Sequence, residues 1–155
     1  VYLMRFPSWQ SQLYAVHMGR LFRYSLCVVF SKYFMGQKKT LVLGASENPS
    51  RYSYLAVRKL RSYNHPVIAV GNREGHIGDI AISKEKVQEE GVDTITLYLN
   101  PNNQKPYYDY ILSLKPKRIV FNPGTENEEL MEMAEKEGIE PFTGCTLVML
   151  STGQY

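Results

Sequence analysis

The stretch TLVLGASENPSRYSYLAVRKL, from Thr40 to Leu60, has the outline of a strand, a turn and a helix. Its apolar run, 41–43, stops at Gly44, and an apolar pattern of helical period begins near Ser53. Where such a unit opens a parallel sheet, the N–H groups of the turn and of the helix start point at one spot, which suits a phosphate. We therefore expect an anion-binding turn here. The alternative is a strand-to-helix connection that binds no ligand.

The turn departs from the dinucleotide fingerprint G-x-G-x-x-G, which requires glycine at three positions. These positions hold Gly44, Ser46 and Pro49, so only the first one matches. The Ser46 hydroxyl can instead donate a hydrogen bond, and Pro49 restricts the chain before the helix. Arg51 and Ser53 add a cation and a capping oxygen. The turn is therefore predicted to bind an anion without being a standard NAD site.

Beyond this stretch the chain alternates between expected strands and expected helices. Apolar runs predict four further strands, at 67–70, 94–99, 118–121 and 139–142. Helices are expected over 83–90, 107–114 and 125–138, the last beginning with a capping box of Thr125 and Glu128. The isoleucines at 77, 80 and 82 predict a short extended excursion. The pattern predicts an α/β fold, namely a Rossmann-like three-layer sandwich with a mostly parallel five-stranded sheet.

Composition narrows the class of protein. The chain has 155 residues, 44% of them apolar and 21% charged, which fits one domain with a real core. Residues 1–39 contain six Lys or Arg and no acidic residue, so the remainder has twelve basic and fifteen acidic residues. No nucleic-acid partner is therefore expected. Cys27 and Cys145 lie far apart, which favours a reducing compartment, and we expect a cytoplasmic protein with no metal site.

Residues 1–38 are expected to form an N-terminal extension to a domain that covers 39–155. The extension is rich in Arg and aromatic residues, and its apolar run at 26–30 is too short to span a bilayer, so no membrane partner is expected. Three interpretations fit: a targeting presequence, an amphipathic surface helix, or sequence upstream of a true start at Met35. We favour the last, because Met35 leads directly into the first strand.

The end of the second strand bears on the nucleotide that the turn would bind. NAD-binding domains have an acidic residue there that holds the ribose, whereas an arginine accommodates an additional ribose phosphate. Here the position offers Asn72 and Arg73. These residues favour a nucleotide with a phosphorylated ribose, and NADP and coenzyme A (CoA) are the two common ones. The alternative is a surface cation, Arg73, paired with the neighbouring Glu74.

The run from Gly44 to Tyr54, GASENPSRYSY, resembles the G-A-S-x-x-P-x-R-x-S-Y turn of the small bacterial CoA-binding proteins. Those proteins are single Rossmann-like domains similar to the CoA-binding domain of the succinyl-CoA synthetase alpha subunit. The resemblance extends from about Lys39 to Cys145. It departs from the family at 70–72, which reads V-G-N where the family usually has V-N-P. The resemblance implies that the CoA phosphates are held by Gly44, Ala45, Ser46, Arg51 and Ser53.

Similarity to the synthetase domain implies two more parts of the site. The segment Tyr98, Leu99, Asn100 and Pro101 would line the nucleotide cleft. The segment 122–125, which includes Gly124, would face the pantetheine arm. Cys145 falls where the small proteins also tend to have a cysteine. Ligands of open α/β sheets lie outside the carboxyl ends of the strands, which agrees with these loops.

The resemblance implies a stand-alone CoA-binding protein without its own catalytic domain, whose partner is CoA or acyl-CoA. An enzyme is the less favoured interpretation, since His17, His65 and His76 show no arrangement for nucleophilic or metal chemistry. Cys145 could form a mixed disulfide with CoA, but a buried and inert thiol is the preferred interpretation. The alternatives are an NADP-binding oxidoreductase-like domain and a noncatalytic subunit of an acyl-CoA ligase. A second copy of the chain or a ligase subunit would then be the protein partner.

Overall fold

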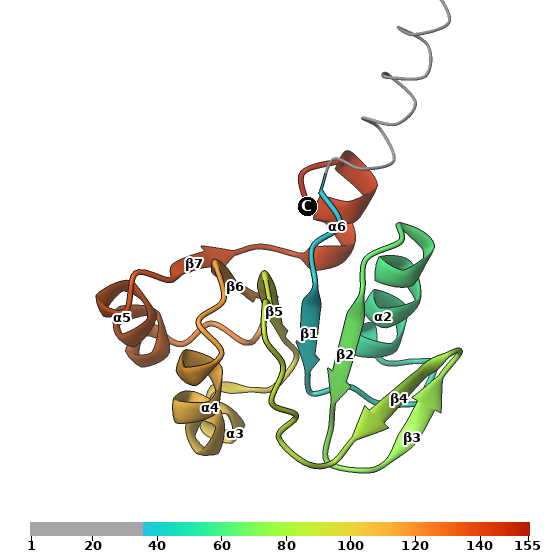
Figure 1. Ribbon diagram of the computed structural model, residues 1–155, viewed down its shortest axis with the longest axis horizontal. Helices are drawn as coiled ribbons and strands as arrows, with labels where there is room; N and C mark the ends of the chain where they lie inside the picture. Colours follow the sequence, from blue (N-terminus) through green and yellow to red (C-terminus); the bar gives the residue numbers. More distant parts are fainter. Residues whose placement is uncertain (1–35) are drawn as a thin grey trace, which may run out of the picture. The chain divides into compact units, whose positions relative to one another are not determined.

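The computed structural model of the protein describes residues 36–155, and Gln37–Tyr155 form one compact unit (Figure 1). Most of the predicted N-terminal extension, with Met35 and Cys27, therefore lies outside the described residues.

At the centre of this unit is a sheet of seven strands in the order β3-β4-β2-β1-β5-β6-β7 (Figure 1). All neighbouring strands run parallel except β3 and β4, which are antiparallel. The prediction of an α/β fold with a mostly parallel sheet is confirmed, but the predicted number of five strands is wrong. The strands are β1 (Thr40–Leu43), β2 (Val67–Val70), β3 (Gly75–Ile77), β4 (Ile80–Ser83), β5 (Thr94–Leu97), β6 (Arg118–Phe121) and β7 (Glu140–Thr143).

The two additional strands lie in the segment for which a short extended excursion was predicted. β3 and β4 form a hairpin in which Ile77 pairs with Ile80, and Gly78 adopts a φ of +64° in the turn. β4 then adds to β2 in parallel, which buries Ile82. Each strand has only three or four residues. Because such short strands are defined by their pairing partners rather than by a local pattern, the sequence alone did not reveal them.

Helices cover both faces of the sheet. Val42 of β1 packs into a cluster with Val57 and Leu60 on the side of α2 and α6. Leu41 and Leu43 point to the opposite face and pack with residues of α4 and α5. This alternation follows from the period of two along a strand, and it gives three layers. The helices are α2 (Tyr52–Ser62), α3 (Pro101–Gln104), α4 (Tyr108–Ser113), α5 (Glu128–Lys136) and α6 (Thr146–Thr152), with a 3-10 turn, η1 (Lys105–Tyr107), between α3 and α4.

Two local predictions about helices are wrong. Residues 84–90 form no helix; the Ser83 hydroxyl accepts a hydrogen bond from the Glu85 N–H instead of starting one. The predicted capping box at the start of α5 is also absent, because Asn127 is the N-cap and accepts from the Leu130 N–H at 3.3 Å. The Thr125 hydroxyl donates to the Asn122 carbonyl instead.

β1 lies where the strand order changes direction, with β2 on one side and β5 on the other. In open α/β sheets, the crevice outside the carboxyl ends of two such strands is where ligands bind. The fold thus brings three connections to one edge of the sheet: those after β1, β2 and β5. The predicted turn at 44–53 is the first of them.

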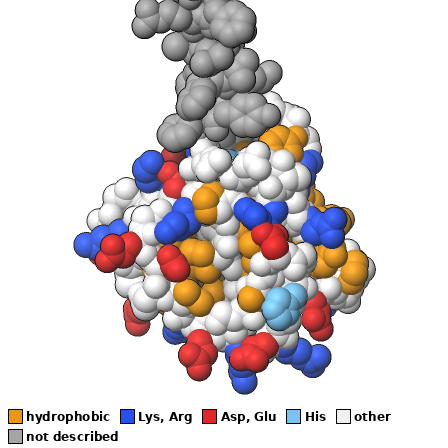
Figure 2. All heavy atoms as spheres, turned by 45° about the vertical axis from the view of Figure 1, so that its right-hand side comes forward, with side chains coloured by type: hydrophobic (Ala, Val, Ile, Leu, Met, Phe, Trp, Pro, Cys, Tyr) orange, Lys and Arg blue, Asp and Glu red, His pale blue; other side chains and the backbone are white. Residues whose placement is uncertain are grey.

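The face of the molecule drawn in Figure 2 has mixed charge. Figure 2 shows Lys and Arg side chains interspersed with Asp and Glu side chains, with apolar side chains between them. No helix within residues 36–155 combines the length and the apolar character that crossing a membrane requires.

Candidate functional site

The turn after β1 begins at a residue that must be glycine. Gly44 has a φ of +95°, and a Cβ atom there would lie 2.9 Å from the Tyr98 carbonyl carbon and 3.0 Å from a Leu99 methyl group. Both obstacles belong to the connection after β5. Gly44 therefore lets the chains leaving β1 and β5 approach each other closely, at the point where the strand order reverses.

Gly71 makes a second close approach, after β2. A Cβ atom at this position would lie 2.3 Å from the Ala45 carbonyl oxygen and 3.0 Å from a carbon of Ile82. The V-G-N sequence at the end of β2 thus has a structural reason, because only glycine leaves room for the turn after β1 to cross there.

The backbone N–H groups of the turn fall into two sets. Those of Gly44 and Ala45 both donate to the Val70 carbonyl, each at 2.9 Å. Within residues 36–155 the N–H groups of Ser46, Glu47, Tyr52 and Ser53 have no hydrogen-bond partner, so four N–H groups of this segment are unpartnered. The first two lie in the turn and the last two in the first turn of α2.

The start of α2 supports the same interpretation. Its N-cap is Arg51, whose side chain makes no capping hydrogen bond, and no acidic residue lies in its first turn. The predicted capping role of the Ser53 hydroxyl is not observed, since Ser53 lies inside the helix and is buried. A helix N-terminus with neither a side-chain cap nor an acidic residue retains its positive end for an external anion.

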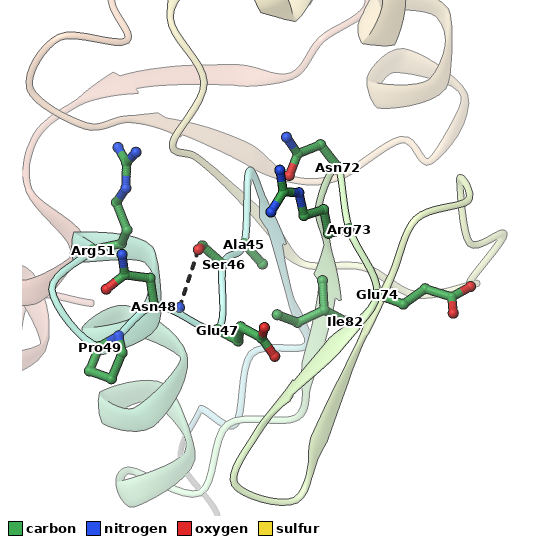
Figure 3. A pocket seen from close by; sticks show the side chains of 10 residues that line it. All are labelled: Ala45, Ser46, Glu47, Asn48, Pro49, Arg51, Asn72, Arg73, Glu74 and Ile82. Carbon is green, nitrogen blue, oxygen red and sulfur yellow. Dashed lines mark hydrogen bonds between the residues drawn. The ribbon is translucent and has the colours of Figure 1, made fainter.

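A pocket of about 620 Å³ opens beside this turn. Figure 3 shows that Arg51 enters from the start of α2, while Asn72 and Arg73 enter from the connection after β2, with Ser46 between them in this view. The Asn48 side chain shapes the turn by accepting from the Ser50 N–H at 3.0 Å. The lining residues are Ala45, Ser46, Glu47, Asn48, Pro49, Arg51, Asn72, Arg73, Glu74 and Ile82.

Two cations of the pocket are unpaired. Neither Arg51 nor Arg73 forms an ion pair or a side-chain hydrogen bond with any residue of 36–155, so the pairing of Arg73 with Glu74, which was the alternative interpretation, is not observed. Figure 3 shows Glu74 extending away from the turn. Glu47 lies against β3, where its Oε2 would be 2.6 Å from a Cβ atom at Gly75. The guanidinium groups are thus available to an anion.

The structure brings together five of the eleven predicted ligand residues in the lining of this pocket: Ala45, Ser46, Arg51, Asn72 and Arg73. Gly44 and Ser53 are not lining residues; Gly44 directly precedes Ala45, and Ser53 lies in the first turn of α2. Tyr98, Leu99, Asn100 and Gly124 are not among the lining residues, because they lie on the connections after β5 and β6.

These four residues have local roles in the connections. The Asn100 side chain caps α3 by accepting from the Asn103 N–H at 3.0 Å, and Leu99 packs against the core. The Gly124 N–H donates to Glu126 Oε2 at 2.8 Å. Tyr98 packs on the α2 side of the sheet, and its buried hydroxyl has no partner within residues 36–155. Burial raises the pKa of this phenol well above its usual value.

A buried polar cluster fixes the start of the connection after β6. The Asn122 side chain donates to Thr96 Oγ1 at 2.7 Å and to the Leu97 carbonyl at 3.0 Å, and it accepts from the Thr146 N–H at 2.9 Å. Thr96 and Thr146 also share a hydrogen bond of 2.7 Å. Asn122 therefore joins β5, β6 and the start of α6.

The remaining nucleophiles and bases lie apart from the pocket. His65 lies at the amino end of β2, where its Nδ1 accepts from the Lys38 N–H at 3.0 Å. Cys145, the N-cap of α6, is half-buried, and no group of three metal-binding side chains occurs within residues 36–155.

Sequence reasoning missed five lining residues: Glu47, Asn48, Pro49, Glu74 and Ile82. Three of them lie within the quoted turn motif, so their place in the chain was a usable signal. Ile82 had no such signal, because it reaches the pocket only through the parallel pairing of β4 with β2.

Comparison with known protein families identifies the family of this chain. The sequence profile described as "CoA binding domain" matches residues 38–151, nearly all of the described chain. The chain belongs to this CoA-binding domain family. No curated protein matches the sequence.

Several solved structures resemble this member of the family. One, described as an uncharacterized protein, is 56% identical, covers 77% of this chain and 99% of its own, and has a TM-score of 0.76. A conserved hypothetical protein from Pyrococcus furiosus is 28% identical, covers 73% and 98%, and has a TM-score of 0.64. A protein from Thermus thermophilus is 21% identical, covers 79% and 94%, and shares the fold with a TM-score of 0.70.

Proposed function

We propose that this protein binds CoA or acyl-CoA without transforming it, and that the phosphates of the ligand occupy the pocket beside the turn after β1. The observation that carries the proposal is that Ser46, Glu47, Tyr52 and Ser53 have N–H groups without a partner within residues 36–155, in the same segment that lines a pocket with two unpaired arginines. A diphosphate offers several charged oxygens, and N–H groups at a helix start together with guanidinium groups are their usual partners.

The proposal assigns different roles to the predicted residues. The N–H groups of Ser46 and Ser53 and the side chains of Ser46 and Arg51 bind the diphosphate. Gly44 and Ala45 shape the turn, because their own N–H groups already bind Val70. Asn72 and Arg73 receive the adenosine, with the arginine on the ribose phosphate. We assign the connection after β5, with Tyr98, Leu99 and Asn100, to the pantetheine arm rather than to the nucleotide cleft that the resemblance implies, together with Gly124 after β6.

Calorimetric titration with CoA, dephospho-CoA and NADP tests this assignment. Binding of CoA that weakens by about tenfold when the ribose phosphate is removed is the expected result, since one charge-assisted contact is lost. Tighter binding of NADP than of CoA would favour the oxidoreductase-like alternative. No binding of any of the three would contradict the proposal.

A role as a noncatalytic ligase subunit would use the same pocket. The two functions differ in whether a protein partner is needed. Measuring CoA affinity with the purified chain alone separates them, because a stand-alone binding protein is expected to reach its full affinity without a second subunit.

A further inference from the structure

Gln104, at the end of α3, is completely buried and joins two connections at the carboxyl edge of the sheet. Its Nε2 donates to the Leu99 carbonyl at 2.9 Å and to the Thr125 carbonyl at 2.7 Å. Leu99 follows β5 and Thr125 follows β6, which are neighbouring strands. Because both hydrogens belong to one planar amide, the two carbonyls are held at a fixed separation.

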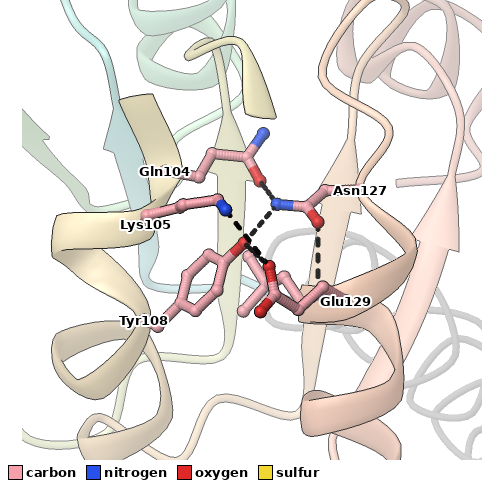
Figure 4. A network of polar contacts seen from close by, with 6 residues as sticks. Gln104, Lys105, Tyr108, Asn127 and Glu129 are labelled. Carbon is pink, nitrogen blue, oxygen red and sulfur yellow. Dashed lines mark hydrogen bonds and ion pairs between the residues drawn. The ribbon is translucent and has the colours of Figure 1, made fainter. Parts of the chain in front are cut away.

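The orientation of this amide is fixed in turn by its neighbours, as Figure 4 shows. Gln104 Oε1 accepts from Asn127 Nδ2 at 2.8 Å, and the same nitrogen donates to the Tyr108 hydroxyl at 2.8 Å. The Tyr108 hydroxyl donates to Glu129 at 3.1 Å. Asn127 Oδ1 is the cap of α5, so this amide cannot turn over without losing the cap. Gln104 must therefore direct its NH₂ group at the two carbonyls.

The connection after β5 is also in direct contact with the turn after β1. A Cβ atom on Gly44 would meet the carbonyl group of Tyr98 and the side chain of Leu99. The connection after β5 therefore borders the turn without forming part of it. Gln104 itself cannot touch a ligand, because none of its surface is exposed.

We propose that Gln104 is a positioning residue that holds the connections after β5 and β6 in the arrangement that receives the pantetheine arm of CoA. This inference rests on the proposed function. Without the two Nε2–H donors, the carbonyls of Leu99 and Thr125 lose their shared partner, and the two connections must be ordered by the ligand itself. Ordering of loops on binding lowers affinity, and the effect falls on the part of the ligand that touches them.

The test compares two ligands in calorimetry with the full chain: CoA, and adenosine 3′,5′-bisphosphate, which lacks the pantetheine arm. Gln104→Glu keeps the shape of the side chain but replaces the donor with a carboxylate. We expect the Kd for CoA to rise by about tenfold, while the Kd for the bisphosphate changes by less than about twofold. Gln104→Met, which is uncharged and of similar length, gives the same comparison if the glutamate variant does not fold.

Tyr108→Phe is the matched control. It removes the hydroxyl from the same buried network but leaves both bonds from Gln104 to the carbonyls in place. Its two Kd values are expected to equal those of the wild-type protein.

Equal weakening of both ligands in the Gln104 variants would show a general loosening of the domain and overturn the inference. Unchanged CoA affinity in folded Gln104→Met would overturn it as well, while leaving the proposed function in place. Failure of the wild-type protein to bind CoA would instead remove the proposed function, and the inference with it.

Discussion

The turn after β1 and the network around Gln104 use similar groups in opposite ways. In the turn and the first turn of α2, four N–H groups have no partner within residues 36–155, and neither do the guanidinium groups of Arg51 and Arg73 in the pocket beside it. In the network, the amide of Gln104 and that of Asn127 are fully used by neighbouring groups. Ser46, Glu47 and Tyr52 are not buried, so water can satisfy their N–H groups until a ligand arrives, whereas an unpaired donor in the buried network would be costly.

This difference indicates that the two regions have separate roles, one in binding and the other in supporting the fold. A region that binds must keep donors available, and it therefore contributes little to stability. A region that supports must have no spare donors, and it contributes to stability without touching the ligand. Substitutions in the two regions should consequently separate along two measured quantities, the free energy of unfolding and the affinity for CoA.

The largest effect is expected at Gly44, where the two regions meet. Gly44→Ala adds a Cβ atom 2.9 Å from the Tyr98 backbone at a φ of +95°, and should lower the free energy of unfolding by about 3 kcal/mol. Urea unfolding measures it. Gly78→Ala is the control, since Gly78 also has a positive φ but has no atom within 4 Å, and its expected cost is about 1 kcal/mol. An equal loss of unfolding free energy in the two variants would show that the close approach of Gly44 to Tyr98 does not contribute.

Removal of the central amide should come next. Gln104→Leu leaves the carbonyls of Leu99 and Thr125 and one hydrogen of Asn127 without partners in a buried place. The expected loss is about 2 kcal/mol of unfolding free energy, measured by the same urea titration. Ser46→Ala, in the turn, removes one exposed hydrogen bond, in which the Ser46 hydroxyl accepts from the Asn48 N–H at 3.3 Å, and is expected to change this quantity by less than about 0.5 kcal/mol. A loss of about 2 kcal/mol in both variants would contradict the proposal that the turn binds the ligand while the network stabilises the fold.

The arginines of the pocket should show the reverse behaviour. Arg51→Ala and Arg73→Ala should each weaken CoA binding by about tenfold in calorimetry, because each removes a charge-assisted contact. Their unfolding midpoints should match the wild-type value, since neither residue has an internal partner. Arg58→Ala is the control, because Arg58 is exposed on α2 and does not line the pocket. If Arg58→Ala weakened CoA binding equally, Arg51 and Arg73 would act by general electrostatic attraction and not by direct contact with the ligand.

The smallest effect is expected from His65, which lies apart from both regions. Burial, followed by the charges of Lys38 and Arg118, lowers the pKa of His65 below its ordinary value. As the pH falls below about 6.5, the unfolded chain takes up a proton before the folded one does, so stability should decrease and then level off. His65→Gln should remove this decrease between pH 7 and pH 5, and His76→Gln, at an exposed position, should retain it. If the decrease in stability persisted in His65→Gln, a titratable group other than His65 would cause it.

The parts predicted from sequence are those defined by neighbours along the chain. Gly44, Pro49 and the helix that follows them form a local signal, and the turn lies where that signal placed it. The β3–β4 hairpin was missed because the pairing of β4 with β2 is nonlocal. The helix predicted over 83–90 is absent because Val87 is the only apolar residue of 84–90, which is too few to pack a helix against the core.

The same distinction applies to the site. Arg51 is near the turn in the sequence, and Arg73 was found through the general rule for the end of a second strand. Which N–H groups remain available could not be foreseen, because the pairing of Gly44 and Ala45 with Val70 depends on how β1 and β2 lie together. The network around Gln104 was also invisible, since its members come from three separate elements.

The most direct test of the central claim is a crystal structure of the protein with CoA. We predict that oxygens of the diphosphate lie within hydrogen-bond distance of the N–H groups of Ser46 and Ser53, while the Val70 carbonyl keeps its bonds from Gly44 and Ala45. CoA bound elsewhere on the protein, with the turn after β1 in contact only with water, would contradict the claim.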